Sequence, residues 1–300
     1  MNSGNNFEQR ILAIDANLAL KYPLNKRILQ VIKEMYPATY RNILNTDLNQ
    51  RTSEDISNVF KVYNWYQEKY PNQKNIINSF GYKPFLLNGK IYHILINLDW
   101  VSDAQEMQQK LKELIDDMNQ LEKDALVKND LDLIDNEFQK GRNFYKKIHE
   151  LEMKIEEGSI DAEIIELLAA GIFDINISLS AFRNPFYLDS QPIMFHAQQA
   201  VEKFLKSLCA QHKLPEIRRS GKTVDDYVKK NYNHNINKLS QDLKTLLPDF
   251  NAIAIKVQEL HTEVPEMTIR YKNSGKTIEN AIHCIDLMIE ICGYVAENFT

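Results

Sequence analysis

A polar stripe follows one side of the segment FHAQQAVEKFLKSLCAQHK, residues 195–213. His196, Gln199, Lys203 and Lys206 are spaced by three, four and three residues, so on an α-helix they share one face. A histidine can take or give a proton near neutral pH, and lysines carry positive charge. Two interpretations fit this stripe: a functional face that contacts a ligand, or a solvated face beside the core with His196 hydrogen-bonded locally.

The neighbouring face of the same segment is apolar. It carries, at the same helical spacing, Met194, Ala197, Val201, Phe204 and Leu208. This periodicity predicts a helix with one buried side. Glu202 precedes Lys206 by four residues, the orientation in which such a pair stabilises a helix by about 0.3–0.5 kcal/mol.

The composition is typical of a soluble globular protein, with 44% hydrophobic and 26% charged residues. A length of 300 residues allows two domains. The net charge of −5 argues against a protein that binds nucleic acid through bulk charge alone. By inspection, no apolar run approaches the roughly 20 residues of a membrane span, and the first residues do not resemble a signal peptide. We therefore expect a cytoplasmic protein that does not bind membranes.

The three cysteines, Cys209, Cys284 and Cys292, all fall within helical apolar patterns. We expect them to be buried free thiols in a reducing compartment. The spacing of cysteines and histidines does not resemble a zinc site, so we expect neither a metal nor a cofactor.

Residues 1–100 predict an α-rich N-terminal domain with one β-hairpin near 84–99. The hairpin signal is Asn88-Gly89 between two β-branched and aromatic runs. The helices are predicted at about 7–21, 24–35, 53–69 and 72–79. Aromatic residues interleaved with lysines fit an aromatic core with a basic rim, or side chains that stack on bases. This domain resembles no family that we recognise.

Residues 101–157 predict an amphipathic helical connector with apolar heptad spacing. The first helix of the pair runs from Met107 to Ala125, and the second follows a cap at Asn129 or Asp130. The pattern leaves open whether the two form a hairpin or one extended arm. Residues 158–300 then predict a compact bundle with helices at about 160–182, 189–212, 222–246, 250–262 and 275–299. The fold class is therefore mainly α.

The segment FHAQQAVEKFLKSL resembles the signature helix of HEPN domains, which reads roughly H-x-A-x-Q-A-x-E-K-x-L-K-x-L. HNINKLSQDL at 234–243 is similar to the second landmark of that family. IRYKNSGKTIENAIHCIDLMIEIC at 269–292 is similar to its Arg-Tyr turn and long terminal helix. The resemblance covers about residues 158–300. It implies an up-and-down helical bundle that commonly dimerises, in a family that binds nucleotides or cleaves RNA without metal, often in toxin–antitoxin or defence systems.

The ribonuclease motif of this family is absent from its expected position. Active members carry Arg-x(4–6)-His near the start of a late helix, whereas no histidine follows Arg270 until His283. Metal-free RNA cleavage needs a base for the 2′-hydroxyl and a cation for the phosphorane. The candidates within the bundle are His234, His261 and Arg270, and whether they catalyse a reaction stays open.

We therefore predict a HEPN-type protein that binds a nucleotide or RNA and forms a homodimer through its bundle. If it is an enzyme, it is a metal-independent ribonuclease. The side chains expected to contact the ligand are His196, Gln199, Lys203, Lys206 and Tyr271. The alternative is a non-catalytic dimeric scaffold in which residues 1–100 bind another protein. A positive groove favours the first function and an apolar groove favours the second.

Overall fold

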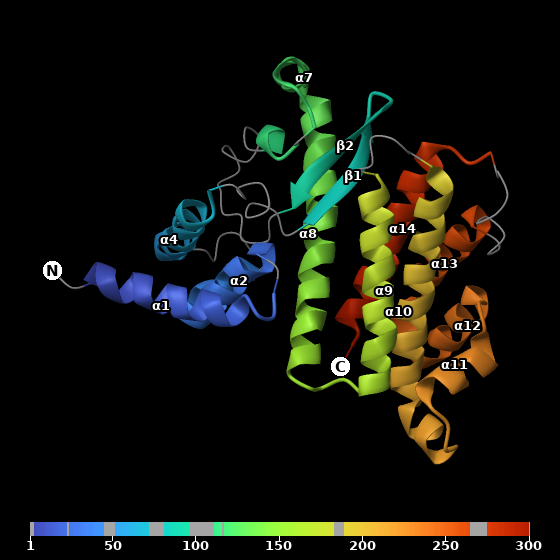
Figure 1. Cartoon of the computed structure of the whole chain (residues 1–300). Coiled ribbons are helices and arrows are strands. Elements are labelled where there is room, and N and C mark those ends of the chain that lie inside the picture. The colour runs from blue at the N-terminus through green and yellow to red at the C-terminus, as the bar shows by residue number, and fades with distance from the viewer. Residues whose placement is uncertain are drawn as a thin grey trace. The chain divides into compact units, whose positions relative to one another are not determined.

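The computed structural model describes residues 3–22, 24–44, 52–71, 81–96, 111–115, 117–182, 189–264 and 275–299. The chain forms two compact units. The N-terminal unit comprises Met1–Lys83 and Tyr92–Arg142, and the C-terminal unit comprises Pro84–Ile91 and Asn143–Thr300. The described part of the chain is mainly helical, as the sequence predicts (Figure 1).

The N-terminal unit begins with α1 (Ser3–Leu18), α2 (Leu24–Met35), α3 (Pro37–Leu44) and α4 (Ser53–Lys69). These helices confirm three of the predicted segments, while the helix predicted at 72–79 lies outside the described residues. The sequence did not predict α3, where a proline stands at the first position and is tolerated because its missing N–H needs no helical partner there.

Tyrosines form part of the core of this unit. Asp15 on α1 is 3% exposed and accepts hydrogen bonds from the hydroxyls of Tyr66 and Tyr70, each at 2.6 Å. Arg27 on α2 contacts the same carboxylate at 3.1 Å. Tyr66 is fully buried. Tyr66 therefore fits the interpretation as an aromatic core, and Tyr70 is half-buried beside it.

The predicted hairpin is present as β1 (Gly81–Leu87) and β2 (Lys90–Ile96). Asn88 and Gly89 both have positive φ, 51° and 75°, as the tight two-residue turn of a hairpin requires. On β2, Ile94 forms an antiparallel bridge with Ile115. The hairpin therefore lies where the sequence analysis placed it.

The connector differs in part from its prediction. Its second helix is α8 (Lys128–Glu156), whose first turn includes Asp130, the acceptor of the Val127 N–H at 3.0 Å. The first helix does not run continuously through 111–125, because Ile115 pairs with β2 and a new helix, α7 (Gln120–Ala125), begins after Asn119. A capping box starts α7, with the Asn119 side chain accepting from the backbone of Glu122 at 3.0 Å.

The C-terminal unit contains a helical bundle made of α9 (Ala162–Ala181), α10 (Ser190–Arg219), α11 (Val224–Tyr232), α12 (Ile236–Leu246), η3 (Pro248–Phe250), α13 (Asn251–Glu263) and α14 (Ile278–Glu297). The central helix α10 packs against both α9 and α14 (Figure 1). It continues through Pro215, beyond its predicted end at 212, and buries Ile217 completely. The helix predicted at 222–246 is two helices, because Asn233 takes a positive φ of 49° and Asn235 caps α12.

All three cysteines are buried free thiols, which confirms the prediction. Burial raises the pKa of each thiol, to about 12 for Cys284 and well above its usual value for Cys292. We therefore expect a disulfide reagent at pH 8 to modify these thiols on the order of 100-fold more slowly in the native protein than in guanidinium chloride. Fast modification of the native protein would contradict the burial of α10 and α14.

By length and composition alone, α9 could cross a membrane, although the sequence predicted no such span. Of its most apolar 18-residue window, 39% is buried. The core helix of a soluble bundle meets the same criterion, so this observation is weak evidence for a membrane span.

Candidate functional site

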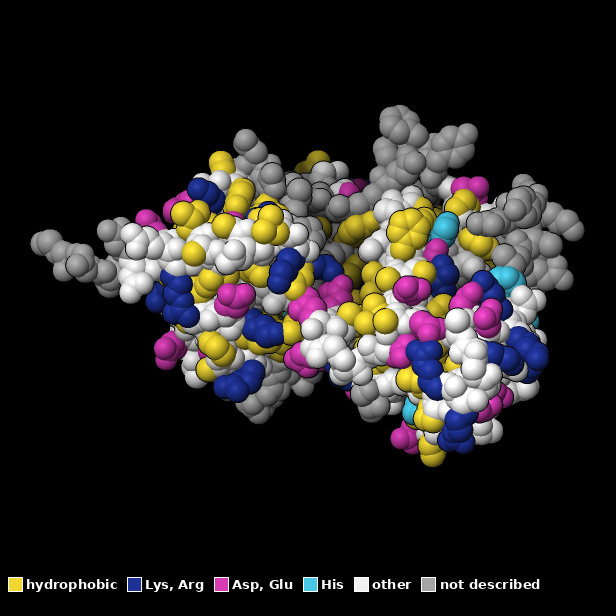
Figure 2. All heavy atoms as spheres, turned by 60° about the horizontal axis from the view of Figure 1, so that its bottom comes forward, with side chains coloured by type: hydrophobic (Ala, Val, Ile, Leu, Met, Phe, Trp, Pro, Cys, Tyr) yellow, Lys and Arg dark blue, Asp and Glu magenta, His cyan; other side chains and the backbone are white. Residues whose placement is uncertain are grey.

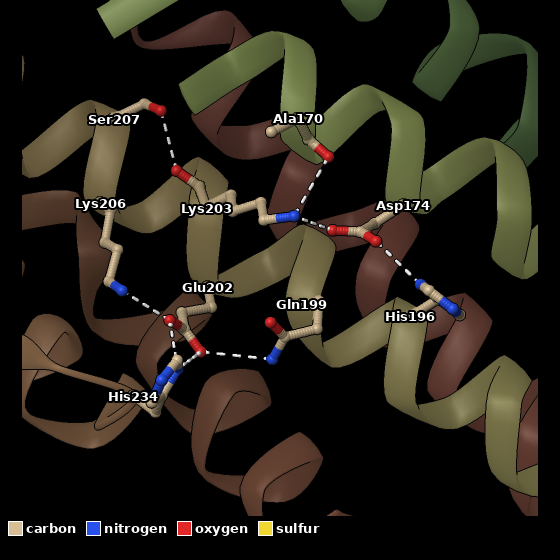
Figure 3. A network of polar contacts seen from close by, with 9 residues as sticks. All are labelled: Ala170, Asp174, His196, Gln199, Glu202, Lys203, Lys206, Ser207 and His234. Carbon is tan, nitrogen blue, oxygen red and sulfur yellow. Dashed lines mark hydrogen bonds and ion pairs between the residues drawn. The ribbon is translucent and has the colours of Figure 1, made fainter. Parts of the chain in front are cut away.

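Asp174 on α9 joins two side chains of the predicted polar stripe on α10 (Figure 3). One carboxylate oxygen lies 2.8 Å from His196 Nδ1, and the other binds the ammonium of Lys203. The side chain of Asp174 is 6% exposed, whereas those of His196 and Lys203 are 22% and 28% exposed. We call these three residues the Asp174 cluster. Its carboxylate is a buried anchor for two groups that reach the surface.

The Asp174 cluster fixes the orientation of the imidazole. Because a carboxylate only accepts hydrogen bonds, Nδ1 of His196 carries the hydrogen in this contact and Nε2 is the nitrogen that can act on a ligand. The ring of Phe195 packs edge-on against His196, with centroids 5.2 Å apart. The cluster therefore presents a positioned proton acceptor or donor beside a fixed ammonium, which suits an anionic ligand.

A second carboxylate on α10 organises the remaining members of the stripe (Figure 3). Glu202 accepts a hydrogen bond from Lys206 Nζ at 2.6 Å and a weaker one from Gln199 Nε2 at 3.4 Å, and it lies 3.1 Å from His234 Nδ1. The side chains of Glu202 and Lys206 are 4% and 9% exposed, while that of His234 is 48% exposed. We call these four residues the Glu202 cluster. It consists of the buried Glu202–Lys206 ion pair and the half-exposed His234 beside it.

Close packing of α9 on α10 brings Asp174 to the stripe. A Cβ atom on Gly171 would lie 2.7 Å from the ring of Phe204, so glycine permits this approach. About two turns further along α9, the Ser178 hydroxyl donates to the Ile193 carbonyl oxygen at 2.9 Å. These contacts hold the carboxylate of Asp174 in register with α10.

Residues 167–298 match the family model of the HEPN domain. These residues, less than half of the chain, form its HEPN domain. The match begins within α9 and ends just after α14, so it contains both clusters. This confirms the resemblance seen in the sequence. No curated protein and no solved structure matches the chain.

The predicted ligand-binding residues within the described part of the HEPN domain belong to two different clusters. His196 and Lys203 share Asp174, whereas Gln199 and Lys206 share Glu202. Tyr271 lies outside the described residues. The lysine side chains are thus ion-paired rather than free, and Lys206 is a largely buried member of its pair.

The candidate catalytic residues are not joined within the described part of the HEPN domain. His234 belongs to the Glu202 cluster. His261 lies on α13, and its buried Nδ1 has no hydrogen-bond partner among the described residues. Arg270 lies outside the described residues. Among the residues that the structure describes, no group of three or more His, Cys, Asp or Glu side chains could hold a metal ion.

The surface of the HEPN domain carries mixed charge. On the face drawn in Figure 2, basic and acidic side chains are interspersed over this domain. In the C-terminal unit, Arg218 binds both Asp161 and Glu163, at 2.7 and 2.6 Å, and its hydrogen bonds lower the pKa of each carboxyl group. Lys213 likewise pairs with Asp242 at 2.7 Å. Any anionic ligand on this face would depend on a few positioned groups rather than on bulk charge.

Asp174 was not predicted from the sequence, although a signal was present. In the stretch GIFDINISLS, Asp174 is an isolated acidic residue in an otherwise apolar or uncharged segment. A carboxylate on the buried side of a helix needs a partner because an unpaired buried charge is strongly unfavourable. The lysines of the α10 stripe were the available partners.

Proposed function

We propose that the HEPN domain binds a nucleotide or RNA through a phosphate group that contacts His196 and Lys203. The observation that carries this proposal is the Asp174 cluster, in which a buried carboxylate holds two partly exposed groups in fixed positions. Such preorganisation lowers the entropic cost of ligand binding. Asp174 acts as a positioning residue. The ligand contacts are Nε2 of the His196 imidazole and the ammonium of Lys203.

The Glu202 cluster has a supporting role in this proposal. Its buried Glu202–Lys206 pair fixes one face of α10, and Gln199 also donates to Glu202. His234 remains half exposed there. We propose binding rather than catalysis as the primary activity, because the ribonuclease motif of the family is absent from its expected position after Arg270. A metal-independent ribonuclease activity, if found, would first direct mutagenesis to His234, His261 and Arg270.

Thermal melting in EDTA tests this proposal, with ATP, the other nucleoside triphosphates and a short single-stranded RNA in separate arms. At a ligand concentration 100-fold above Kd, we expect the Tm of the HEPN domain to rise by about 5–10 °C. His196→Gln and Lys203→Met should each reduce the ligand-induced rise to near zero, whatever they do to the starting Tm. The arms distinguish a free nucleotide from RNA.

Lys229→Met is the matched control, because Lys229 is 69% exposed and pairs with an exposed aspartate at 2.5 Å. It should keep the full ligand-induced rise. Gel analysis of the RNA from the same samples reports cleavage. A rise that survives both His196→Gln and Lys203→Met, or the absence of a rise with any ligand, would remove the proposal.

We also propose that the protein is a cytoplasmic homodimer formed through its HEPN domain and that it acts in a toxin–antitoxin or defence system. The alternative is a non-catalytic dimeric interaction scaffold. In that alternative, residues 1–100 bind a protein partner. Copurification of a protein partner without any nucleotide-induced rise in Tm would favour the scaffold.

A further inference from the structure

The turn between α11 and α12 has a strained backbone at Asn233. The φ and ψ of this residue are 49° and −115°, and the Asn235 N–H donates to the Tyr232 carbonyl oxygen at 2.9 Å. This geometry is that of a type II′ turn with Asn233 at the first central position, where glycine is favoured because φ is positive. An asparagine there makes the folded state less stable than a glycine would.

Contacts on both sides of Asn233 hold the turn in this conformation. Tyr232 is 2% exposed, and its hydroxyl donates to Asp242 at 2.8 Å. On the other side, His234 Nδ1 lies 3.1 Å from Glu202 (Figure 3). Backbone strain persists only where the surrounding structure fixes it, and it concentrates at functional sites.

The side chain of Asn233 does not help to hold the turn. It is exposed, and it makes no hydrogen bond with the residues that the structure describes. By contrast, the amide of Asn231 donates to the Tyr227 carbonyl oxygen, and the side chain of Asn235 caps α12. The fold therefore gains nothing from the amide of Asn233, and contact with a ligand would explain why the strained position carries it.

We propose that Asn233 recognises the base of the nucleotide, free or within RNA, and that this base is adenine. The inference rests on the proposed function and names the specificity of its ligand. An asparagine amide has one donor and one acceptor group and pairs bidentately with the N6 amino group and N7 of adenine. The imidazole of His234, held by Glu202 and 48% exposed, offers a flat face on which the same base stacks.

The turn lies close to the phosphate contacts of the Asp174 cluster. Both clusters use residues 196–206 of α10, and Glu202, the partner of His234, is the residue before Lys203 (Figure 3). Neighbouring residues of a helix differ by only about 1.5 Å in height and about 100° in direction. We therefore expect one nucleotide to reach from Lys203, which contacts its phosphate, to the turn, which contacts its base.

Isothermal titration of the full chain with adenosine monophosphate, inosine monophosphate and ribose 5-phosphate tests the inference. Inosine keeps the size of the base but has a carbonyl oxygen in place of the N6 amino group, and ribose 5-phosphate has no base. We expect the wild-type protein to bind adenosine monophosphate on the order of 10-fold more tightly than inosine monophosphate. Ribose 5-phosphate should bind more weakly than either.

Asn233→Gly should weaken the binding of adenosine monophosphate to the level of inosine monophosphate and leave that of ribose 5-phosphate unchanged. Without ligand, the glycine variant should melt about 2–4 °C higher, because its turn is unstrained. A purely structural residue would not couple a loss of affinity to a gain in stability. Asn233→Ala removes the amide but keeps the strain, so it should lose the discrimination without the gain in Tm.

Asn88→Gly is the matched control, because Asn88 also has a positive φ, of 51°, but lies outside residues 167–298. Its affinities should equal those of the wild type. Equal wild-type affinities for the two monophosphates, or a discrimination that survives both Asn233 variants, would overturn the inference and leave the phosphate contacts of the proposed function in place. If none of the three ligands binds, the inference is wrong, and the RNA arm of the melting experiment decides whether the proposed function fails as well.

Discussion

Replacing Glu202 with alanine is expected to lower the free energy of unfolding of the HEPN domain by about 3–5 kcal/mol. Glu202 accepts from Lys206 at 2.6 Å, and both side chains are at most 9% exposed. The alanine variant leaves the Lys206 ammonium buried without its carboxylate, and that uncompensated charge causes most of the loss. His234, at 3.1 Å, loses its partner as well but can turn to water because it is half exposed.

Urea unfolding at pH 7 measures this loss, with the double variant Glu202→Leu/Lys206→Met as a second measurement. The double variant should recover most of the stability, because replacing both members of a buried pair by apolar residues is often neutral. Glu259→Ala is the control: Glu259 also contacts a histidine, His283, at 2.9 Å, but both side chains are more than 40% exposed. A loss of about 1 kcal/mol or less is expected there. Equal losses for Glu202→Ala and Glu259→Ala would show that the Glu202 cluster is solvated.

The Glu202–Lys206 pair also shows what a single helix pattern can and cannot predict. The spacing of four residues correctly predicted that the two side chains meet. It also suggested a surface pair, because periodicity within one helix does not report which neighbours cover it. Residues more than twenty positions away, such as His234, also contact Glu202.

The same limit explains the polar stripe. The sequence placed His196 and Lys203 on one helix face, and the structure places them on one carboxylate. Asp174 itself lies 29 residues before Lys203, on another helix. Long-range pairing of this kind depends on how α9 packs against α10. The family resemblance implied a helical bundle but not which side chains of these two helices meet.

The predictions of the hairpin and of the first connector helix both depended on local sequence signals. Asn88-Gly89 predicted the hairpin correctly because two consecutive positive φ angles demand such residues. The heptad pattern misled over residues 111–125, since apolar side chains spaced by three or four residues can also be buried by a chain that pairs with a strand, while Met107 lies outside the described residues. Leu114 is buried there beside the bridge of Ile115, whereas Leu121 is 81% exposed. The cap at Asn119 was the available sign that a helix starts anew.

In the N-terminal unit, Glu137→Ala is expected to lower the free energy of unfolding by about 3–5 kcal/mol. Glu137 on α8 binds Lys83 of β1, whose side chain has no exposure to solvent, and also Lys140 at 2.7 Å. Lys140 is 36% exposed and can be solvated in the variant. Lys83 cannot reach water without displacing the surrounding core, where Ile96 packs tightly against Gly141.

The pH dependence of this pair has a definite sign. Burial alone would raise the pKa of Glu137, but the charges and hydrogen bonds of Lys83 and Lys140 outweigh burial and lower it. A carboxyl group with a lowered pKa in the folded state stabilises the protein above the usual glutamate pKa of about 4.3. That contribution is lost as the pH falls through the lowered value. The difference between wild type and Glu137→Gln should therefore be large at pH 7 and shrink steadily below about pH 4.

Urea unfolding at pH 7 and at pH 3 measures both effects. Glu150→Gln is the matched control on the same helix, because Glu150 is 46% exposed and its contact with Lys146 is long, at 3.7 Å. Its effect should stay within about 0.5 kcal/mol at either pH. If Glu137→Gln behaved like Glu150→Gln at pH 7, Lys83 would have to be hydrated, and the packing of β1 on α8 would be looser than Gly141 indicates. A difference that grew on acidification would instead mean that burial dominates and that the pKa of Glu137 is raised.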